Sequence, residues 1–401
     1  MTLPLIVYRS LRQHALSTII TAGGIALASG LLMCVWMVKT QSQAAFTQTT
    51  TGFDAVLGAR GSKLQLVLNA IFHLEASAGN MAAADVEAIR RHPMIKTAIP
   101  IAVGDNLRGF RLVGTVPELF TSVEYAPGRK FVLAAGGKLF AADAKQAVAG
   151  SFAAQRLGLK VGDGFRPFHG LAFDPRAEHA DDFTVTGILA PTNTPADRVI
   201  WIPLRGLQTM GGHDPKAATE VSAVLLQLRA PTAGFMLDMM YNKQGNRLTF
   251  AYPVGAIIAE LFSKISWFDQ VLALVAYLVA LVAAGSVLAS IYNSMNARRR
   301  DLAILRALGA RRRTIFGAVL AEAACIGALG AAAGFAVYFG LFAGVAQVIR
   351  AQTGVVLELG AGHPVLWLCP LAMIAVCALG GVVPALKAYR TPVAETLAPI
   401  S

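Results

Sequence analysis

Four long apolar runs limit what this chain can fold into more than any other feature of its sequence. Residues 16–38, 271–297 and 365–386 contain no charged side chain, and residues 315–349 contain only Glu322. A helix rises about 1.5 Å per residue, so about 20 residues cross the roughly 30 Å hydrocarbon core of a membrane. Each run meets that length. The sequence therefore predicts an α-helical membrane protein with four transmembrane helices.

The first apolar run shares some features with a cleaved secretion signal, because basic residues precede it and Ser42-Gln43-Ala44 follows it. Cleaved signals have apolar cores of about 7–15 residues, and residues 16–38 are longer than that. We therefore expect an uncleaved membrane anchor. Residues 3–12 predict an amphipathic helix along the inner membrane interface, so that residues 1–40 hold this helix and the first span.

The net charge of +12 is concentrated beside the apolar runs. The short segments next to the runs carry eleven Lys and Arg against two acidic residues, whereas residues 41–265 carry 22 against 18. Lys and Arg accumulate in the cytoplasmic loops of membrane proteins. We therefore place the N and C termini in the cytoplasm and residues 41–265 outside. The distribution indicates contact with membrane lipid and argues against nucleic acid as a partner.

Residues 41–265 predict a mixed α+β extracytoplasmic domain inserted between transmembrane helices 1 and 2. Apolar and β-branched runs separated by Gly/Pro turns predict strands near residues 55–59, 95–103, 111–116, 183–189, 199–202 and 221–228. Helical patterns cover residues 64–74, 81–91 and the start of 152–164. We expect two lobes, the second over about residues 145–229, with residues 230–264 leading back to the membrane.

The four cysteines, Cys34, Cys325, Cys369 and Cys377, all lie in the apolar runs. The outer region therefore has neither a disulfide framework nor a thiolate metal site. We interpret the four thiols as small packing residues.

The loop between the second and third apolar runs carries the most informative motif. Within residues 298–313 a short amphipathic helix is expected between two basic clusters, because Leu302, Leu305 and Leu308 recur at helical spacing. Gly309 stands where a helix C-terminal glycine is expected, and the arginines after it suit the negative end of a helix dipole. Such a helix suits docking onto a cytoplasmic partner. The alternative is a basic loop that only fixes membrane topology.

Three motifs together make the chain similar to MacB/FtsX-type ABC transporter permeases over nearly its whole length. They are Arg9-Ser10-Leu11-Arg12 before the first run, the segment from Arg299 to Ala310, and Pro384-Ala385-Leu386-Lys387-Ala388-Tyr389-Arg390-Thr391-Pro392 at the end of the last run. The loop motif is the strongest of the three. Glutamate is commoner in this family at the position of Asp301.

The resemblance implies a coupling helix that seats on a separate ABC ATPase subunit. The candidate contact residues are Arg299, Arg300, Asp301, Leu302, Leu305, Arg306, Leu308 and Gly309. It also implies a homodimer or heterodimer of permeases with two ATPase subunits in the bacterial cytoplasmic (inner) membrane. A MacB-like periplasmic domain at residues 41–265 and an FtsX-like permease domain at 266–401 follow, and a periplasmic adaptor or substrate-binding protein is a further expected partner.

The sequence contains no G-x-x-x-x-G-K-[ST] phosphate-binding loop. Residues 58–63 are rich in glycine, but their spacing differs and they lie on the outer side. We therefore expect no cofactor in this chain, with ATP and Mg²⁺ on the partner subunit. The sequence also lacks H-E-x-x-H and any nucleophile–base arrangement, so we do not expect an enzyme.

Glu322 lies inside the third apolar run, roughly 10 Å along the expected helix. Charges inside a membrane are costly and often functional, and members of the family commonly have a glutamate here. The alternative is a structural acid near the inner face that pairs with Arg306, Arg312 or Arg313. The small residues of the same run suit close helix packing or a dimer interface, namely Gly327, Gly330, Ala331, Gly334 and Gly340.

The outer region also contains five histidines, His73, His92, His169, His179 and His213. The stretches His169-Gly170-Leu171 and Glu178-His179-Ala180-Asp181-Asp182 are rich in the imidazole and carboxylate groups that bind divalent metals. Surface loops also favour such residues for solubility, and tight ligand spacing is absent. The sequence therefore assigns no metal site and leaves His169, His179 and His213 as candidate ligands.

Two functions fit these observations. The first is the permease of an ATP-driven complex that exports or extracts cargo on the outer side of the membrane. The second is a non-transporting permease that transmits a conformational signal to an extracytoplasmic partner. Both need the same coupling helix, and the size of the outer domain favours the first.

Overall fold

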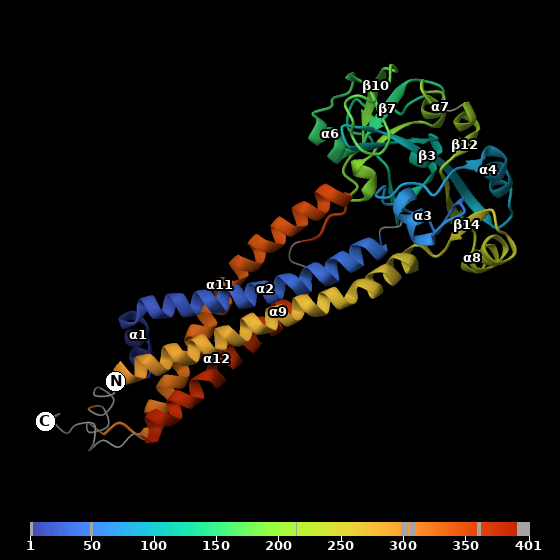
Figure 1. The fold of residues 1–401 in the computed structure, drawn as a ribbon. Coiled ribbons are helices and arrows are strands. Elements are labelled where there is room, and N and C mark those ends of the chain that lie inside the picture. Colours follow the sequence, from blue (N-terminus) through green and yellow to red (C-terminus); the bar gives the residue numbers. More distant parts are fainter. Residues whose placement is uncertain are drawn as a thin grey trace. The chain divides into compact units, whose positions relative to one another are not determined.

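The computed structural model describes residues 3–48, 51–213, 215–297, 304, 309–358 and 362–390. Within these residues four helices are long and apolar enough to cross a membrane, as the apolar runs predict: α2 (Ala15–Gln48), α9 (Val254–Ala297), α11 (Arg312–Thr353) and α12 (Val365–Arg390) (Figure 1). The chain divides into two compact units. The membrane unit comprises Met1–Gln41, Ile265–Gln347 and Glu358–Ser401, and the outer unit comprises Ser42–Lys264 and Val348–Leu357.

The membrane unit begins with a short helix, α1 (Leu3–Gln13), ahead of the first span. Glycines let α2 and α11 approach closely, since a Cβ atom at Gly330 would lie 2.6 Å from the Cβ of Ile25. A Cβ at Gly334 would lie 3.0 Å from that of Ser29. Small residues in a membrane helix allow this close backbone approach. The packing role expected for these two glycines is therefore confirmed within a single chain.

The outer unit is built on a ten-stranded mixed sheet with the order β14-β1-β13-β3-β4-β11-β7-β10-β8, and β9 pairs with β3. The strands are β1 (Ala55–Ala59), β3 (Ile95–Leu107), β4 (Phe110–Thr115), β7 (Gln146–Ala149), β8 (Gly164–Phe165), β9 (Phe168–His169), β10 (Phe183–Ile188), β11 (Ile200–Pro203), β13 (Ala223–Leu228) and β14 (Leu248–Ala251). Two small ribbons join β2 (Met81–Ala82) to β12 (Glu220–Val221) and β5 (Glu124–Ala126) to β6 (Arg129–Lys130). The mixed α+β class expected for the outer region is confirmed.

Short helices surround this sheet. They are α3 (Lys63–Ala70), α4 (Ala83–Arg90), α5 (Glu118–Ser122), α6 (Ser151–Leu157), α7 (Leu204–Gln208) and α8 (Pro231–Asp238), with 3-10 turns η1 (Pro195–Arg198) and η2 (Pro215–Thr219) and the π-helical turn η3 (Met239–Gln244). The helix α6 ends at Gly158, whose φ of 71° is the left-handed conformation that glycine adopts readily at a helix C-terminus.

The core of the outer unit lies on both faces of the sheet. On β13, Leu225 packs in one apolar cluster, whereas its neighbours Val224 and Leu226 pack in another. Successive side chains of a strand point to opposite faces, so the strand is buried on both sides. Burial on two faces explains why the strand reads as a continuous apolar run in the sequence.

The long strand β3 joins two halves of the sheet, with β14, β1 and β13 on one side and β4, β11, β7, β10 and β8 on the other. We call the side that contains β13 the first half. The first part of β3, Ile95 to Ile101, pairs with β13, and its second part, Ala102 to Leu107, pairs with β4. The expectation of two lobes is therefore only partly met, because one strand belongs to both halves and β13 lies in the first half. The register shifts between Val103 and Asp105. Such a bulge bends a strand and redirects its side chains.

The end of α11 and the residues after it, Val348–Leu357, belong to the outer unit. Val355 is buried in the same apolar cluster as Trp201. The guanidinium of Arg198, at the end of η1, donates a hydrogen bond to the carbonyl of Gln352. The outer unit is thus made from two separate parts of the sequence, and the second part was not expected from the sequence.

Candidate functional sites

Three histidines and one aspartate meet at one end of β3. Asp105 lies just after the bulge and stands opposite His169 in the antiparallel pairing of β3 with β9. His179 follows β9 in the next loop, and His213 lies in the loop between α7 and η2. Residues far apart in the sequence therefore reach one place because strand pairing and two loops bring them there.

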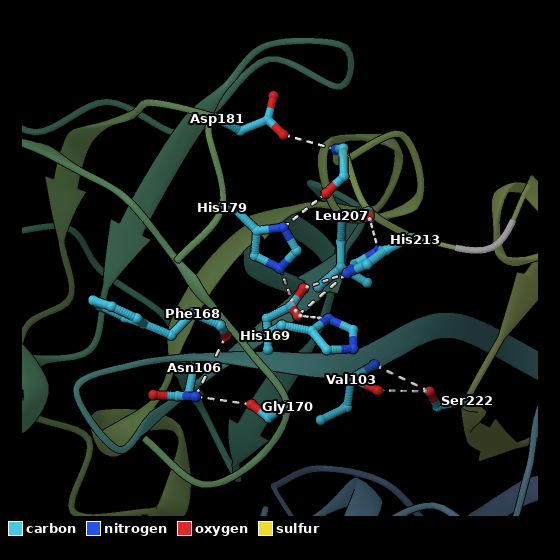
Figure 2. A network of polar contacts seen from close by, with 12 residues as sticks. Val103, Asn106, Phe168, His169, Gly170, His179, Asp181, Leu207, His213 and Ser222 are labelled. Atoms are coloured by element: carbon cyan, nitrogen blue, oxygen red, sulfur yellow. Dashed lines mark hydrogen bonds and ion pairs between the residues drawn. The ribbon is translucent and has the colours of Figure 1, made fainter. Parts of the chain in front are cut away.

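The three imidazoles surround the Asp105 carboxylate. His169 Nδ1 lies 3.3 Å and His179 Nε2 lies 3.2 Å from Asp105 Oδ1. His213 Nε2 lies 3.2 Å from Oδ2 and 3.3 Å from Oδ1. Figure 2 shows the three labelled histidine rings pointing toward one another. One ligand atom from each of the four residues lies within 4.8 Å of all the others.

Burial differs sharply among the four residues. The Asp105 side chain is 0% exposed, and those of His179 and His213 are nearly buried, whereas that of His169 is 60% exposed. The carboxylate oxygen Oδ2 of Asp105 is buried and accepts no well-directed hydrogen bond. Burying a charged oxygen without a hydrogen bond costs free energy unless a nearby cation balances its charge.

The hydrogen bonds on the far side of two rings fix their tautomer. His179 Nδ1 lies 2.8 Å from the carbonyl oxygen of Gly211, and His213 Nδ1 lies 3.2 Å from that of Leu207. A carbonyl oxygen only accepts, so both Nδ1 atoms must carry a proton. In a neutral ring the Nε2 atom then presents a lone pair to the carboxylate. This arrangement is repulsive unless a proton or a metal ion lies between them.

Further polar contacts hold the loops that carry these histidines (Figure 2). The side-chain amide of Asn106 donates to the carbonyls of Phe168 and Gly170 at 3.3 and 2.8 Å, which holds β9 and the start of the loop after it. The Asp181 carboxylate accepts a hydrogen bond of 2.8 Å from the amide of Gly211. The ring positions are therefore set by their surroundings as well as by their contacts with Asp105.

The electrostatics of the cluster favour an ionised carboxylate. Burial alone would raise the pKa of Asp105, but the hydrogen bond and charge of His213, together with those of His179, outweigh burial and lower it. The hydrogen bond to Asp105 raises the pKa of His213, against the effect of burial. Without a metal, a proton on His213 therefore provides the positive charge that the buried carboxylate needs.

A cavity of about 330 Å³ adjoins the cluster. His169 and His213 line it together with Glu220 and Ser222, so two of the imidazoles are reachable from solvent. Asn80 also lines this cavity and donates to the Glu220 carboxylate at 3.1 Å. The cluster thus combines a buried anionic centre with one open side.

The three histidines named from the sequence are brought together, and whether they bind metal stays a prediction. Asp105 was missed, since it follows the strand expected over residues 95–103 in a Gly-Asp-Asn stretch that is typical of an ordinary turn. His73 and His92 lie elsewhere: His73 is buried beside Trp201, and His92 accepts a hydrogen bond from the amide of Met94.

The membrane unit holds the intramembrane acid. The hydroxyl of Ser10, on α1, donates a hydrogen bond to the Glu322 carboxylate on α11. Ser10 belongs to the Arg9-Ser10-Leu11-Arg12 motif, so this contact joins the N-terminal motif to the third span. Whether Glu322 has a role beyond this contact stays a prediction.

The expected coupling residues lie almost entirely outside the described residues. This applies to Arg299, Arg300, Asp301, Leu302, Leu305, Arg306 and Leu308. Gly309 is described, and its φ of 97° is the left-handed conformation expected of a helix C-terminal glycine.

Two family descriptions match the sequence. The MacB-like periplasmic core domain matches residues 16–233, and the FtsX-like permease C-terminal domain matches residues 273–393. No curated protein matches the chain. Among solved structures, the periplasmic region of MacB from Actinobacillus actinomycetemcomitans is 11% identical, with 53% of this chain and 94% of that chain covered and a TM-score of 0.35. The extracellular domain of the noncanonic ABC-type transporter YknZ from Gram-positive bacteria is 14% identical, with 49% and 97% covered and a TM-score of 0.30.

Proposed function

The chain belongs to the MacB/FtsX-type family of ABC transporter permeases, and from that premise we propose that it couples ATP hydrolysis on a separate ATPase subunit to the export or extraction of cargo on the outer side of the membrane. The observation that carries this proposal is the match of both family descriptions, one over the first span and most of the outer domain and one over the last three spans. ATP and Mg²⁺ would be held by the ATPase subunit.

The orientation follows from the charge distribution. The basic residues beside the spans favour cytoplasmic termini in the bacterial inner membrane, with the outer unit in the periplasm. A cysteine at Ser122, which is exposed in the outer unit, should react with an impermeant thiol reagent in intact spheroplasts. A cysteine at Ala310 should stay unlabelled, and labelling at Ala310 alone would reverse the orientation.

The coupling step is assigned to the loop after the second span. The leucine stripe of that loop would bind an apolar groove on the ATPase, and the arginines around it would add electrostatic attraction. Two permeases, identical or different, would each seat one ATPase subunit. A periplasmic adaptor or substrate-binding protein would meet the outer unit.

Two substitutions at one position test this coupling. Leu305→Asp places an unpaired charge in the expected apolar contact, which should cost several kcal/mol of binding free energy, on the order of 2–5 kcal/mol. Leu305→Met keeps the volume and the apolar character, so it should cost less than about 1.5 kcal/mol. The measurement is co-purification of the ATPase and stimulated ATP hydrolysis after reconstitution. Normal coupling in Leu305→Asp would refute this role of the loop.

The runner-up function is a signalling permease that moves no cargo. It shares the coupling helix and differs in what happens outside. Reconstituted vesicles separate the two functions, because only an exporter or extractor lowers the amount of a candidate cargo in the membrane when ATP is added. Retained cargo, combined with ATP-dependent activation of an outer partner, would favour the signalling function.

A further inference from the structure

We propose that Asp105, His169, His179 and His213 form a binding site for one late first-row divalent cation, such as Zn²⁺, in the outer unit. This inference goes beyond the permease function and does not depend on it. It rests on the convergence of four ligand atoms from β3, β9 and two loops.

The spacing of the ligand atoms fits a four-coordinate ion. Zinc binds imidazole nitrogen and carboxylate oxygen at about 2.0–2.2 Å, so the ligands of a tetrahedral site lie about 3.4 Å apart. The imidazole nitrogens lie 3.2 to 3.3 Å from the nearest Asp105 oxygen. All four ligand atoms lie within 4.8 Å of one another, so side-chain shifts on the order of 1 Å would bring them to tetrahedral spacing.

The ring hydrogen bonds match those of metal-binding histidines. A ligating imidazole usually donates its other N–H to a carbonyl or carboxylate, which fixes the ring and the tautomer. His179 and His213 do this with the carbonyls of Gly211 and Leu207. The Nε2 lone pairs of these two rings then both face the carboxylate of Asp105. A divalent cation there turns this repulsion into coordination.

The chemistry of the ligands selects the class of ion. Ca²⁺ and Mg²⁺ prefer sites made of oxygen, whereas three imidazoles and one carboxylate suit Zn²⁺ and its late first-row neighbours. Four protein ligands fill a tetrahedral site, as in structural zinc sites, and leave no position for a reacting water. The exposed His169 and the adjoining cavity provide a path by which the ion reaches the buried carboxylate.

The site would also tie together loops that are far apart in the sequence. His169 ends β9, His179 lies in the loop after β9, and His213 lies in the loop after α7. An ion bound to all three would fasten both loops to β3 through Asp105. Binding is therefore expected to order this end of the outer unit.

The test uses the full chain, purified in detergent through a tag that contains no histidine. Mass spectrometry of the metal content after Zn²⁺ loading and desalting should give one equivalent per chain. Replacement by Co²⁺ should give the intense visible absorption of a four-coordinate site. Asp105→Asn removes the anionic ligand with little change in size, and His169→Ala removes the exposed ligand without disturbing the core.

Loss of an outer-sphere partner typically weakens metal binding by about 10–100-fold, so loss of either ligand should weaken it by about 100-fold or more. His92→Ala, in the same unit but away from the cluster, is the matched control and should bind like wild type. Circular dichroism and gel filtration verify folding, and His169→Ala keeps the test valid if Asp105→Asn fails to fold. The proposal would be overturned if the wild type retained no Zn²⁺, or if both ligand variants retained as much Zn²⁺ as the wild type.

Discussion

His73 illustrates how much one buried side chain depends on its surroundings. It lies in the outer unit with its ring 5.5 Å from that of Trp201, edge to face. Burial lowers its pKa from 6.5 to about 3, and the charge of Arg111 adds to this effect. In the unfolded chain the imidazole has its ordinary pKa of about 6.5. Between these values the unfolded state binds a proton that the native state does not.

The contribution of neutral His73 to the free energy of unfolding is therefore fully present above about pH 6.5, and it is lost as the pH falls toward 3. At pH 5 the loss should reach about 2 kcal/mol, since one pKa unit corresponds to about 1.36 kcal/mol. His73→Asn should flatten this dependence, and asparagine tolerates the native φ of 55°. Calorimetric unfolding of the full chain in detergent at pH 7.5 and 5 measures the difference. Identical pH dependence in the variant and the wild type would contradict the assignment.

At the residue scale the sequence identified three of the four residues of the cluster as candidate ligands. The stretches around His169 and His179 are marked by local composition, and His213 was a candidate by residue type. Asp105 has no such mark, because Gly104-Asp105-Asn106 has the composition of an ordinary turn after the strand expected over residues 95–103. It meets the histidines through strand pairing and a bulge, which are long-range features that sequence spacing does not reveal.

At the element scale, glycines in the third span allow close helix packing. A Cβ at Gly330 would lie 2.6 Å from the Cβ of Ile25 and 2.9 Å from the carbonyl oxygen of Ala22. Gly330→Ala should therefore force α2 and α11 apart and cost about 1–3 kcal/mol, the usual range for overpacking. The thermal midpoint of the purified full chain should fall.

Gly340→Ala is the matched control in the same helix, because a Cβ there meets no atom within 4 Å. Alanine is a better helix former than glycine by about 1 kcal/mol, so this variant should be unchanged or slightly more stable. A Gly330→Ala variant as stable as Gly340→Ala would show that the two helices do not pack closely in the membrane.

The elements with strong periodicity or long apolar runs were predictable, and the shortest were not. The spans and the strands β1, β3, β4, β10, β11 and β13 are confirmed close to their expected positions. The strands β7, β9 and β14 have two to four residues and were missed. Segments this short become strands only because a neighbour pairs with them. The two expected lobes share β3, since the strand continues past its bulge from one half to the other.

At the scale of the whole molecule, the apolar runs predicted the four spans and the domain inserted after the first of them, with one exception. The end of α11 continues into the outer unit, where Val355 joins the apolar core. Residues 348–357 mix apolar and polar side chains, a composition that suits the membrane interface as well as packing in a folded domain. The sequence therefore could not indicate that this segment packs in the outer unit.

This packing gives a route between the third span and the outer unit that can be tested. Arg198 donates to the carbonyl of Gln352, and a Cβ at Gly354 would lie 3.0 Å from the carbonyl oxygen of Thr194. The segment is thus held by a hydrogen bond and by close backbone contact with η1. If movements of α11 reach the outer unit through this contact, Arg198→Ala should weaken their transmission and leave ATP hydrolysis by the partner subunit intact.

Hydrogen exchange of the reconstituted complex measures transmission directly. In the wild type, ATP should change the exchange rates of outer-unit strands, and in Arg198→Ala this change should shrink while hydrolysis continues. Arg205→Ala is the matched control, because Arg205 is exposed and its contact with Asp143 is a 3.6 Å surface ion pair, an interaction worth about 0–1 kcal/mol. An unchanged ATP response in Arg198→Ala would show that this hydrogen bond is not needed for transmission.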